Sequence, residues 1–404
     1  MAKLLWGKVY YQDVFAGYLR QETGERYTFT YAESYLESTN PAIAMTLPRR
    51  EDPFISEGYL PGFFDNMVAE GWLQGMQMRL LGKRHCSRLE LLLAFGLDCA
   101  GAVSVVDPEQ EPLHLSTQDQ KNPQNLAVFH SRASLSGIQP KLTLVKEGNT
   151  FRPAQQGEVS TYIAKLPSET VADIVHNEWL TLIACQALLP EDSFVEMQLA
   201  PLDKICDEAL VVKRFDRDKD GKRIHFEEFN QLLNHASIRK YEGAYKDMAD
   251  FMYTEKKCIP TDVYRLYKRI IVGLIMGNTD MHFKNFACIY HGNQLTLSPS
   301  YDQVAAAIYQ PYQYVALELN NISYKVIGDL KAKHIISLGH DFRLSDSAIH
   351  MAVEEIGRHI PGAIEKVHSA DRELPQLKGK IIQQLEKRWR GTFSLIGQLL
   401  SKKR

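Results

Sequence analysis

The chain has 404 residues, a length that predicts two or three domains at about 150 residues each. Its 47 Lys and Arg residues nearly balance its 49 Asp and Glu residues, which leaves a net charge of −2. This balance argues against a dedicated nucleic-acid-binding protein, which is normally strongly basic. The 45% of hydrophobic residues argues against a disordered chain.

The cysteines and the apolar runs indicate in which cellular compartment the protein occurs. The six cysteines form no C-x-x-C pair, so the sequence predicts neither a zinc ribbon nor a redox dithiol. The first 14 residues lack the apolar core of a signal peptide. The longest apolar runs are much shorter than the roughly 20 residues that a membrane span needs. We therefore expect a soluble, cytoplasmic protein that does not bind membranes.

The first part of the chain has strand and helix signals in alternation. Strands are expected at 4–11, 27–31 and 101–106, and helices at 61–81 and 89–95, the second capped by Ser87. Residues 107–125 are polar and contain three prolines, which is typical of a linker. We place a domain boundary near residue 110.

The rest of the chain begins with strands and then becomes mainly helical. The pattern from residue 128 is strand, turn and strand, followed by a helix after Ser168 that Pro190 ends. Further elements are expected as strands at 195–199 and 208–215, a helix at 261–276 ended by Gly277, and helices in 345–404. A strand-rich half followed by a helical half predicts an α+β protein with two lobes.

A polar cluster directly follows the apolar helix at 261–276. Residues 278–286 read Asn-Thr-Asp-Met-His-Phe-Lys-Asn-Phe, so Asp280 and Asn285 have the D-x-x-x-x-N spacing of a kinase catalytic loop. There, the Asp accepts the proton of the attacking hydroxyl and the Asn oxygen binds Mg²⁺. A predicted hairpin over 286–297 would return Asp302, a second metal ligand, to Asn285. The alternative is a polar loop with solvated side chains.

An upstream segment has the residues of a nucleotide site. Lys165 ends a strand-like stretch, as does the lysine that contacts phosphates in kinases, and Glu178 on the next helix could pair with it. Alternatively, Glu178 lies at the edge of the apolar face and reaches water. Residues 134–141 could cover the phosphates, because Gly137 lets backbone amides approach and Lys141 adds charge. An ordinary turn is the alternative there.

Two features could suggest other metal sites. Residues 216–227 match the D-x-D-x-D-G-x₅-E pattern of an EF-hand calcium loop. However, Arg223 stands where that loop needs an apolar residue, a strand-like stretch precedes it, and no second hand exists. A hairpin turn over 218–221 is the better interpretation. His282 has no second His at ligand spacing, so we expect it to order its loop or contact phosphate.

Together, these blocks resemble the HipA family of toxin kinases from bacterial toxin–antitoxin modules, over nearly the whole chain. Residues 60–66 and 98–103 resemble the family's small N-terminal subdomain. The kinase part has five blocks in the family's order: Ser-Leu-Ser-Gly-Ile-Gln-Pro-Lys at 134–141, Ala-Lys-Leu-Pro at 164–167, His-Asn-Glu at 176–178, Lys-Arg-Phe-Asp-Arg at 213–217, and the block at 278–286.

The resemblance implies a two-lobed protein-kinase-like fold of the α+β class. It implies a small β-rich N-terminal subdomain at 1–110 and a kinase N-lobe with the ATP loop at 111–215. The implied fold has an all-helical C-terminal lobe, and the mainly helical kinase C-lobe with the catalytic loop would occupy 216–404.

The resemblance also implies an ATP- and Mg²⁺-dependent protein serine/threonine kinase. Asp280 would be the catalytic base, Asn285 and Asp302 would hold Mg²⁺, Lys165 would contact the phosphates, and Glu178 would form the structural ion pair. The nucleotide pocket would further include a loop of Ser136, Gly137, Ile138, Gln139, Pro140 and Lys141, a hinge of Lys213, Arg214 and Phe215 that reads adenine, and His282, Lys284 and Tyr301.

Regulation and partners follow from the same resemblance. Family members phosphorylate themselves in the ATP loop, where Ser134 and Ser136 are the candidate acceptors, and the added charge would oppose ATP binding. The implied partners are a helix-turn-helix antitoxin, DNA only through that antitoxin, and a translation protein such as an aminoacyl-tRNA synthetase as substrate. The basic segments 378–390 and 401–404 could contact DNA or tRNA, but we favour the interpretation that they are solvated faces. The rival functions are a small-molecule kinase and a catalytically silent kinase-fold module.

Overall fold

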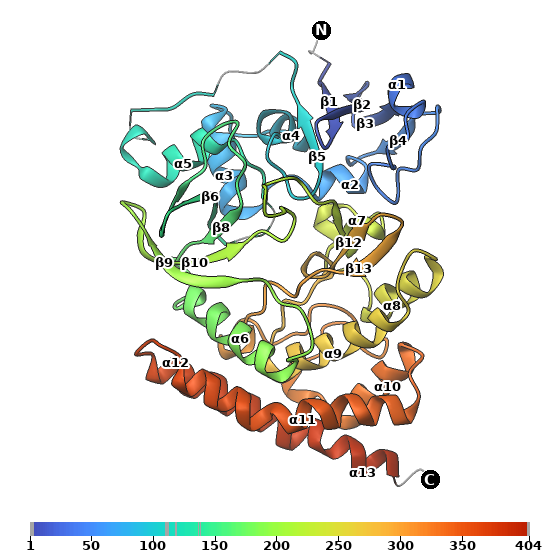
Figure 1. Ribbon diagram of the computed structural model, residues 1–404, viewed down its shortest axis with the longest axis vertical. Helices are drawn as coiled ribbons and strands as arrows, with labels where there is room; N and C mark the ends of the chain where they lie inside the picture. Colours follow the sequence, from blue (N-terminus) through green and yellow to red (C-terminus); the bar gives the residue numbers. More distant parts are fainter. Residues whose placement is uncertain (1–3, 110–112, 118, 136, 138, 402–404) are drawn as a thin grey trace. The chain divides into compact units, whose positions relative to one another are not determined.

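A computed structural model describes residues 4–109, 113–117, 119–135, 137 and 139–401. These residues form two compact units. Unit 1 comprises Met1–Ala172 and Glu196–Arg239, and unit 2 comprises Asp173–Val195 and Lys240–Arg404 (Figure 1). Each unit therefore combines two separate stretches of the chain. The division expected from the sequence, at residues 110 and 215, stays a prediction.

Unit 1 begins with an antiparallel five-stranded sheet in the order β4-β3-β2-β1-β5. Its strands are β1 (Trp6–Tyr11), β2 (Val14–Gln21), β3 (Arg26–Tyr31), β4 (Phe54–Glu57) and β5 (Val103–Val106). Gln12 and Asp13 both have positive φ and join β1 to β2, as a two-residue hairpin turn of this twist requires. The strands expected at 4–11, 27–31 and 101–106 are confirmed to within three residues.

Five α-helices accompany this sheet in the described part of the chain up to residue 131, and two expectations about this part of the chain are wrong. The helices are α1 (Glu33–Leu36), α2 (Gly62–Asp65), α3 (Gly71–Leu80), α4 (Arg88–Phe95) and α5 (Pro123–Ser131). The single helix expected over 61–81 is two helices, because Gly71 has positive φ and breaks the path between them. The expected linker ends in α5, which tolerates Pro123 because a first-turn proline needs no backbone N–H. The Ser87 cap is confirmed, with Glu90 closing a capping box.

A second antiparallel sheet completes the β-structure of unit 1, in the order β7-β6-β8-β10-β9. Its strands are β6 (Lys141–Glu147), β7 (Thr150–Pro153), β8 (Tyr162–Lys165), β9 (Met197–Leu202) and β10 (Cys206–Lys213); β11 (Phe226–Glu228) and α7 (Phe229–Leu232) follow. Residues from both sheets, among them Phe29 and Leu144, belong to one buried hydrophobic cluster. The two sheets are therefore stabilised by a shared core.

A buried ion cluster fixes the segment after β10. The guanidinium of Arg214 is fully buried and donates to Asp98 (3.2 Å), Asp216 (2.8 Å) and the Ser160 hydroxyl (2.7 Å). Arg217 contacts the same two carboxylates at 2.9 and 2.8 Å. Burial alone would raise the pKa of Asp216, but the two arginines outweigh burial and hold that pKa well below its usual value.

The same cluster explains the calcium-like pattern. Asp216, the first acidic residue of this pattern, accepts hydrogen bonds from Arg214 and Arg217. The Asp218 carboxylate accepts hydrogen bonds from the backbone N–H groups of Asp220 and Lys222. Gly221 N–H donates to the Asp218 carbonyl at 3.0 Å, which closes the expected turn. These carboxylates therefore stabilise a tight turn and an ion cluster.

Unit 2 is mainly helical. Its helices are α6 (Ile174–Leu188), α8 (Tyr245–Thr254), α9 (Thr261–Met276), α10 (Ala332–Asp341), α11 (Asp346–Ser369), α12 (Pro375–Gly391) and α13 (Ile396–Ser401), and α11 packs on α6 (Figure 1). It also contains the expected hairpin, β12 (Ala287–His291) and β13 (Gln294–Leu297), so the expectation of an all-helical C-terminal lobe is wrong. α6 begins six residues later than Ser168 suggests, because the Ser168 hydroxyl forms a turn with Thr170 and Val171.

Short 3₁₀ turns connect these elements. They are η1 (Asp119–Lys121), η2 (Ser237–Arg239), η3 (Phe283–Asn285), η4 (Ala306–Ile308), η5 (Ile327–Asp329) and η6 (Phe393–Leu395). Within the described part of the chain, no helix is both long and apolar enough to cross a lipid bilayer.

An ion pair fixes α9 to the chain after α6, and a hydrogen bond from the same arginine fixes it to the chain after the hairpin. Arg269 on α9 contacts Asp192 at 2.6 Å and also donates to the Ser298 carbonyl at 2.7 Å. Arg265, one turn earlier, contacts Asp192 at 2.8 Å. Burial raises the pKa of a carboxyl, but the two arginines outweigh it and lower the pKa of Asp192 to about 2. The pair therefore holds the helix that leads into residues 277–285.

Removing Arg214 should strongly destabilise unit 1. Arg214→Met leaves the carboxylates of Asp98 and Asp216 buried with less positive charge beside them. We therefore expect the free energy of unfolding to fall by about 3 kcal/mol or more. Urea unfolding of the full chain measures it. The matched control is Arg343→Met, whose ion pair with Asp250 is exposed and should contribute under about 1 kcal/mol. Equal effects of the two variants would contradict this account.

The Asp192 carboxylate should stabilise the fold only above acidic pH. Its pKa in the fold is about 2, below the ordinary 3.8, so its contribution of about 2 kcal/mol is present above pH ~4 and is lost as the pH falls through ~2. Comparing unfolding free energies of wild type and Asp192→Asn along an acid series measures it. The difference between the two proteins should shrink as the pH falls; a constant difference would refute the linkage.

Candidate active site

The block with Asp280 lies in the loop that joins α9 to β12 in unit 2. Gly277 ends α9 with φ of 79°, and the Asn278 N–H donates to the Gly273 carbonyl at 2.8 Å, so the expected glycine stop is confirmed. A β-carbon on Gly273 would lie 2.1 Å from the sulfur of buried Met281. The glycine inside the helix therefore allows the loop to pack directly against α9.

One buried amide connects the two acidic positions of the site. The Asn278 side-chain oxygen accepts the Asp280 N–H at 3.1 Å. Its nitrogen donates to the Asp302 carbonyl at 3.3 Å and to the Gln303 side chain at 3.2 Å. Asn278 is fully buried, so this side chain depends on both sets of partners. The sequence interpretation gave Asn278 no role of its own.

Asn285 closes the loop from its far end. Its side-chain nitrogen donates to the Asp280 carbonyl at 2.7 Å, so its amide oxygen is the end that could reach a metal. Asn285 is buried, whereas Asp280 is only partly buried. The Asp280 carboxylate accepts a hydrogen bond from the Tyr241 hydroxyl at 2.7 Å.

The β12–β13 hairpin returns the chain to this loop. The Ser298 N–H donates to the Ala287 carbonyl at 2.9 Å, and the Tyr301 hydroxyl donates to the Lys284 carbonyl at 2.9 Å. The His282 ring nitrogen Nδ1 accepts the Lys284 N–H at 3.3 Å. Asp302 follows with φ of 52°, a left-handed conformation that a residue other than glycine seldom adopts.

Two further contacts, which the sequence patterns did not reveal, support the loop. On α6, Asn177 accepts the Ala305 N–H at 2.9 Å and donates to the Ala305 carbonyl at 3.3 Å. On α12, the Arg388 guanidinium lies beside Gly277, at the negative end of the α9 dipole, and burial lowers its pKa to about 10. The expectation that 378–390 is simply a solvated face is therefore wrong at Arg388.

The predicted phosphate-binding residues lie in unit 1. Lys141 and Lys165 are directly opposite in the β6–β8 register, and each is only 7% exposed. Gly137 has φ of 99°, and a β-carbon there would lie 2.5 Å from the Lys141 ammonium. Gln139 donates to the Leu166 carbonyl at 3.0 Å.

The Pro140 carbonyl accepts the Leu166 N–H at 2.8 Å, which ties the loop before β6 to the end of β8. The other predicted loop residues, Ser136 and Ile138, lie outside the described residues. Ser134 is buried, and its hydroxyl donates to the Met67 carbonyl at 2.8 Å.

The predicted hinge residues have different surroundings. Lys213 is exposed and contacts Glu196 at 2.7 Å, Arg214 belongs to the buried ion cluster, and Phe215 packs edge-on against Phe226. The N–H groups of Lys213 and Arg214 already donate to neighbouring carbonyls, each at 2.9 Å. Adenine recognition at these two residues would therefore fall on carbonyl oxygens.

Glu178 lies on α6 in unit 2 and is only 3% exposed, so the alternative in which it reaches water is wrong. Lys165 belongs to unit 1, and the ion pair between the two stays a prediction.

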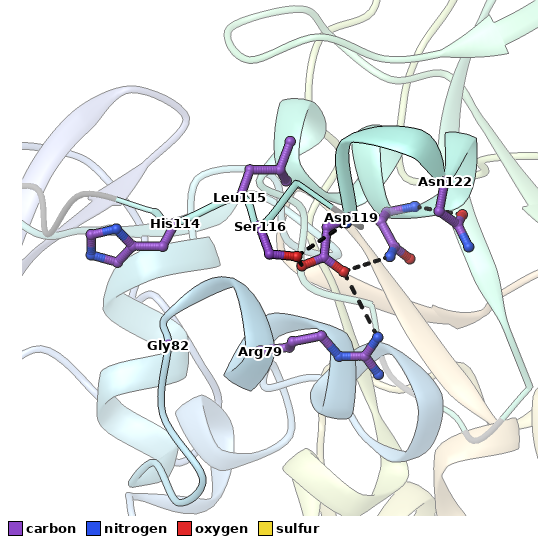
Figure 2. A pocket seen from close by; sticks show the side chains of 8 residues that line it. Arg79, Gly82, His114, Leu115, Ser116, Asp119 and Asn122 are labelled. Atoms are coloured by element: carbon purple, nitrogen blue, oxygen red, sulfur yellow. Dashed lines mark hydrogen bonds and ion pairs between the residues drawn. The ribbon is translucent and has the colours of Figure 1, made fainter.

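A cavity of about 520 Å³ lies elsewhere in unit 1 and contains none of the predicted site residues (Figure 2). Asp119 accepts hydrogen bonds from Ser116 and Asn125 there and lies 3.9 Å from the Arg79 guanidinium. The polar groups of this cavity therefore largely bond to one another.

Two family models match the chain. The model described as HipA N-terminal domain matches residues 7–106, and the model described as HipA-like C-terminal domain matches residues 133–364. The second match alone covers more than half of the chain.

Similar proteins agree with these matches. The chain is 28% identical to the protein Y4dM of Sinorhizobium fredii, named only as a candidate kinase, over 70% of this chain and 73% of that protein. It is 25% identical to the serine/threonine-protein kinase toxin HipA of Shewanella oneidensis, over 91% of this chain and 90% of that protein. A solved structure of HipA from Shewanella oneidensis MR-1, in complex with HipB and operator DNA, is also similar to this chain. The superposition includes 97% of this chain and 99% of that HipA chain, with a TM-score of 0.75 and 21% sequence identity. The chain therefore belongs to the HipA family and has the fold of that HipA protein.

Proposed function

We propose that this chain is an ATP- and Mg²⁺-dependent protein serine/threonine kinase and the toxin of a toxin–antitoxin module. The main support is the Asn278 amide, which holds the backbone of Asp280 on one side and of Asp302 on the other. It brings a candidate general base and a candidate metal ligand to one place, and Asn285 is bound to the same loop.

The chemistry needs few groups. Asp280 accepts the proton of the acceptor hydroxyl while the hydroxyl oxygen forms a bond to the γ-phosphorus of ATP, and the bond from that phosphorus to ADP breaks. The amide oxygen of Asn285 and the carboxylate of Asp302 are hard oxygen donors of the kind that Mg²⁺ prefers. Mg²⁺, when bound, neutralises negative charge on the phosphates.

The nucleotide would be held by unit 1. Lys141 and Lys165 lie opposite each other on neighbouring strands, so that both ammonium groups could contact the phosphates. Gly137 allows the Lys141 ammonium to approach the loop backbone. Lys213, Arg214 and Phe215 would contact adenine, and Glu178 would pair with Lys165.

The proposed partners of this chain are inferred from its membership of the HipA family. The solved relative is in complex with HipB and operator DNA, so we propose a helix-turn-helix antitoxin as partner, with DNA contacted through it. The proposed substrate is a translation protein such as an aminoacyl-tRNA synthetase.

Replacing the base tests the proposal. Asp280→Asn should lower phosphate transfer from labelled ATP by about 100-fold or more, because the amide cannot take the proton. The exposed Asp371→Asn is the matched control and should match wild type. Label entering only small molecules would support a small-molecule kinase. Label in neither protein nor small molecules, with ATP still bound, would support a silent module.

Self-phosphorylation at Ser134 or Ser136 should lower ATP affinity, because a phosphate there carries about two negative charges against those of ATP. The Ser134 hydroxyl is buried against Met67, so its modification requires the loop to leave this position. ATP affinity of the phosphorylated and unphosphorylated chains measures the effect, and Ser134→Ala and Ser136→Ala identify the acceptor. Equal affinities would overturn this prediction.

A further inference from the structure

Tyr241 places a hydroxyl group on the proposed catalytic base. Its phenolic O–H donates to Asp280 Oδ1 at 2.7 Å. A general base must lie about 2.6–3.2 Å from the hydroxyl whose proton it accepts. The tyrosine therefore makes the contact with Asp280 that an acceptor hydroxyl needs.

The backbone around Tyr241 is fixed on two sides. The Phe283 N–H, in the catalytic loop, donates to the Lys240 carbonyl at 3.2 Å. On the other side, the Glu318 N–H donates to the Gly243 carbonyl at 2.9 Å, and the Tyr245 N–H donates to the Glu318 carbonyl at 3.3 Å. Gly243 has positive φ, and a β-carbon there would lie 2.8 Å from the Phe283 ring. The segment thus follows the catalytic loop closely.

The side chain of Tyr241 is held less firmly than its backbone. Its ring contacts the His282 ring edge-on, with centroids 4.9 Å apart. The residue is still 43% exposed to solvent. A rotation of the side chain can therefore take the hydroxyl off Asp280 without moving the backbone.

We infer that Tyr241 is a removable cap on Asp280, and that a polypeptide acceptor reaches this base only by displacing the tyrosine hydroxyl. The inference rests on the proposed function. The hydrogen bond to a carboxylate, the ring contact with His282 and the Lys240 ammonium 5.5 Å from the ring centroid all add to the cost of displacement. An acceptor that makes further contacts can meet that cost, whereas a small hydroxyl compound or water lacks those contacts. The tyrosine thereby favours large acceptors and limits wasteful hydrolysis of ATP.

The test removes the hydroxyl and keeps the ring. The full-length chain, its Tyr241→Phe variant and a matched Tyr324→Phe control are assayed with Mg–ATP and dephosphorylated casein as the acceptor. Tyr324 is 81% exposed and lies outside the proposed machinery. We expect Tyr241→Phe to lower KM for casein by about tenfold or more, the cost of one hydrogen bond to a charged group. The kcat and the KM for ATP should stay within about twofold of wild type, and Tyr324→Phe should match wild type throughout.

Each outcome of this assay either supports or overturns the proposal that Tyr241 caps Asp280. An unchanged KM for casein overturns the cap, and so does a fall in kcat alone, which would make Tyr241 a positioning residue for Asp280. Phosphate found on Tyr241 by peptide mapping also overturns it, because the tyrosine would then be an acceptor. A silent wild type with an active Tyr241→Phe supports the cap in its strongest form. If both proteins bind ATP and neither transfers phosphate, the proposed function fails and the cap with it; if both transfer equally, only the cap fails.

Discussion

The arrangement of unit 2 around the loop that contains Asp280 depends on the side chain of Asn278. A buried primary amide loses about 1–3 kcal/mol for each polar group left without a partner. Asn278 meets this requirement by bonding to the backbone of Asp280 with its oxygen and to Asp302 and Gln303 with its nitrogen. The loop after α9 and the segment after β13 are separated by the β12–β13 hairpin, and satisfying this one side chain requires both to be in place. The Arg269 bond to Ser298 and the Asn177 bonds to Ala305 hold the second segment on either side of Asp302.

Local signals predicted much of the fold. The α9 helix, its stop at Gly277, the Ser87 cap and the β12–β13 hairpin all depend on neighbours in the sequence, and all are confirmed. The predicted elements were wrong where contacts between residues distant in the sequence help to determine the structure. At the break between α2 and α3, besides the local effect of Gly71, the Asn66 side chain bonds to the distant His235 carbonyl (2.8 Å) and Asn230 side chain (2.7 Å). Buried Val68 in the same stretch is equally compatible with a continuing helix.

The candidate site was predicted in a similar way. Spacing indicated Asp280, Asn285 and Asp302, because the chemistry of a kinase loop constrains residue types along the chain. The roles of Asn278, Asn177 and Tyr241 arise from contacts between segments, for which a single sequence carries no spacing rule. Gly273 is the one sequence feature that could have indicated such a contact. A glycine inside a helix lowers the stability of the helix by about 1 kcal/mol, so its presence indicates that another segment packs closely against the helix there. The residue that approaches it, Met281, was not evident from the sequence.

The interleaving of the two units has a consequence for how the chain is made. Residues 173–195, which contain α6, leave the ribosome before the rest of unit 2. The helix that packs on α6, α11, begins only at Asp346. While more than a hundred further residues are synthesised, the face of α6 that packs on α11 lacks this partner. Nascent chains with such exposed apolar helices are the ones that aggregate or engage chaperones, so the yield of folded protein should depend on how fast this middle stretch is translated.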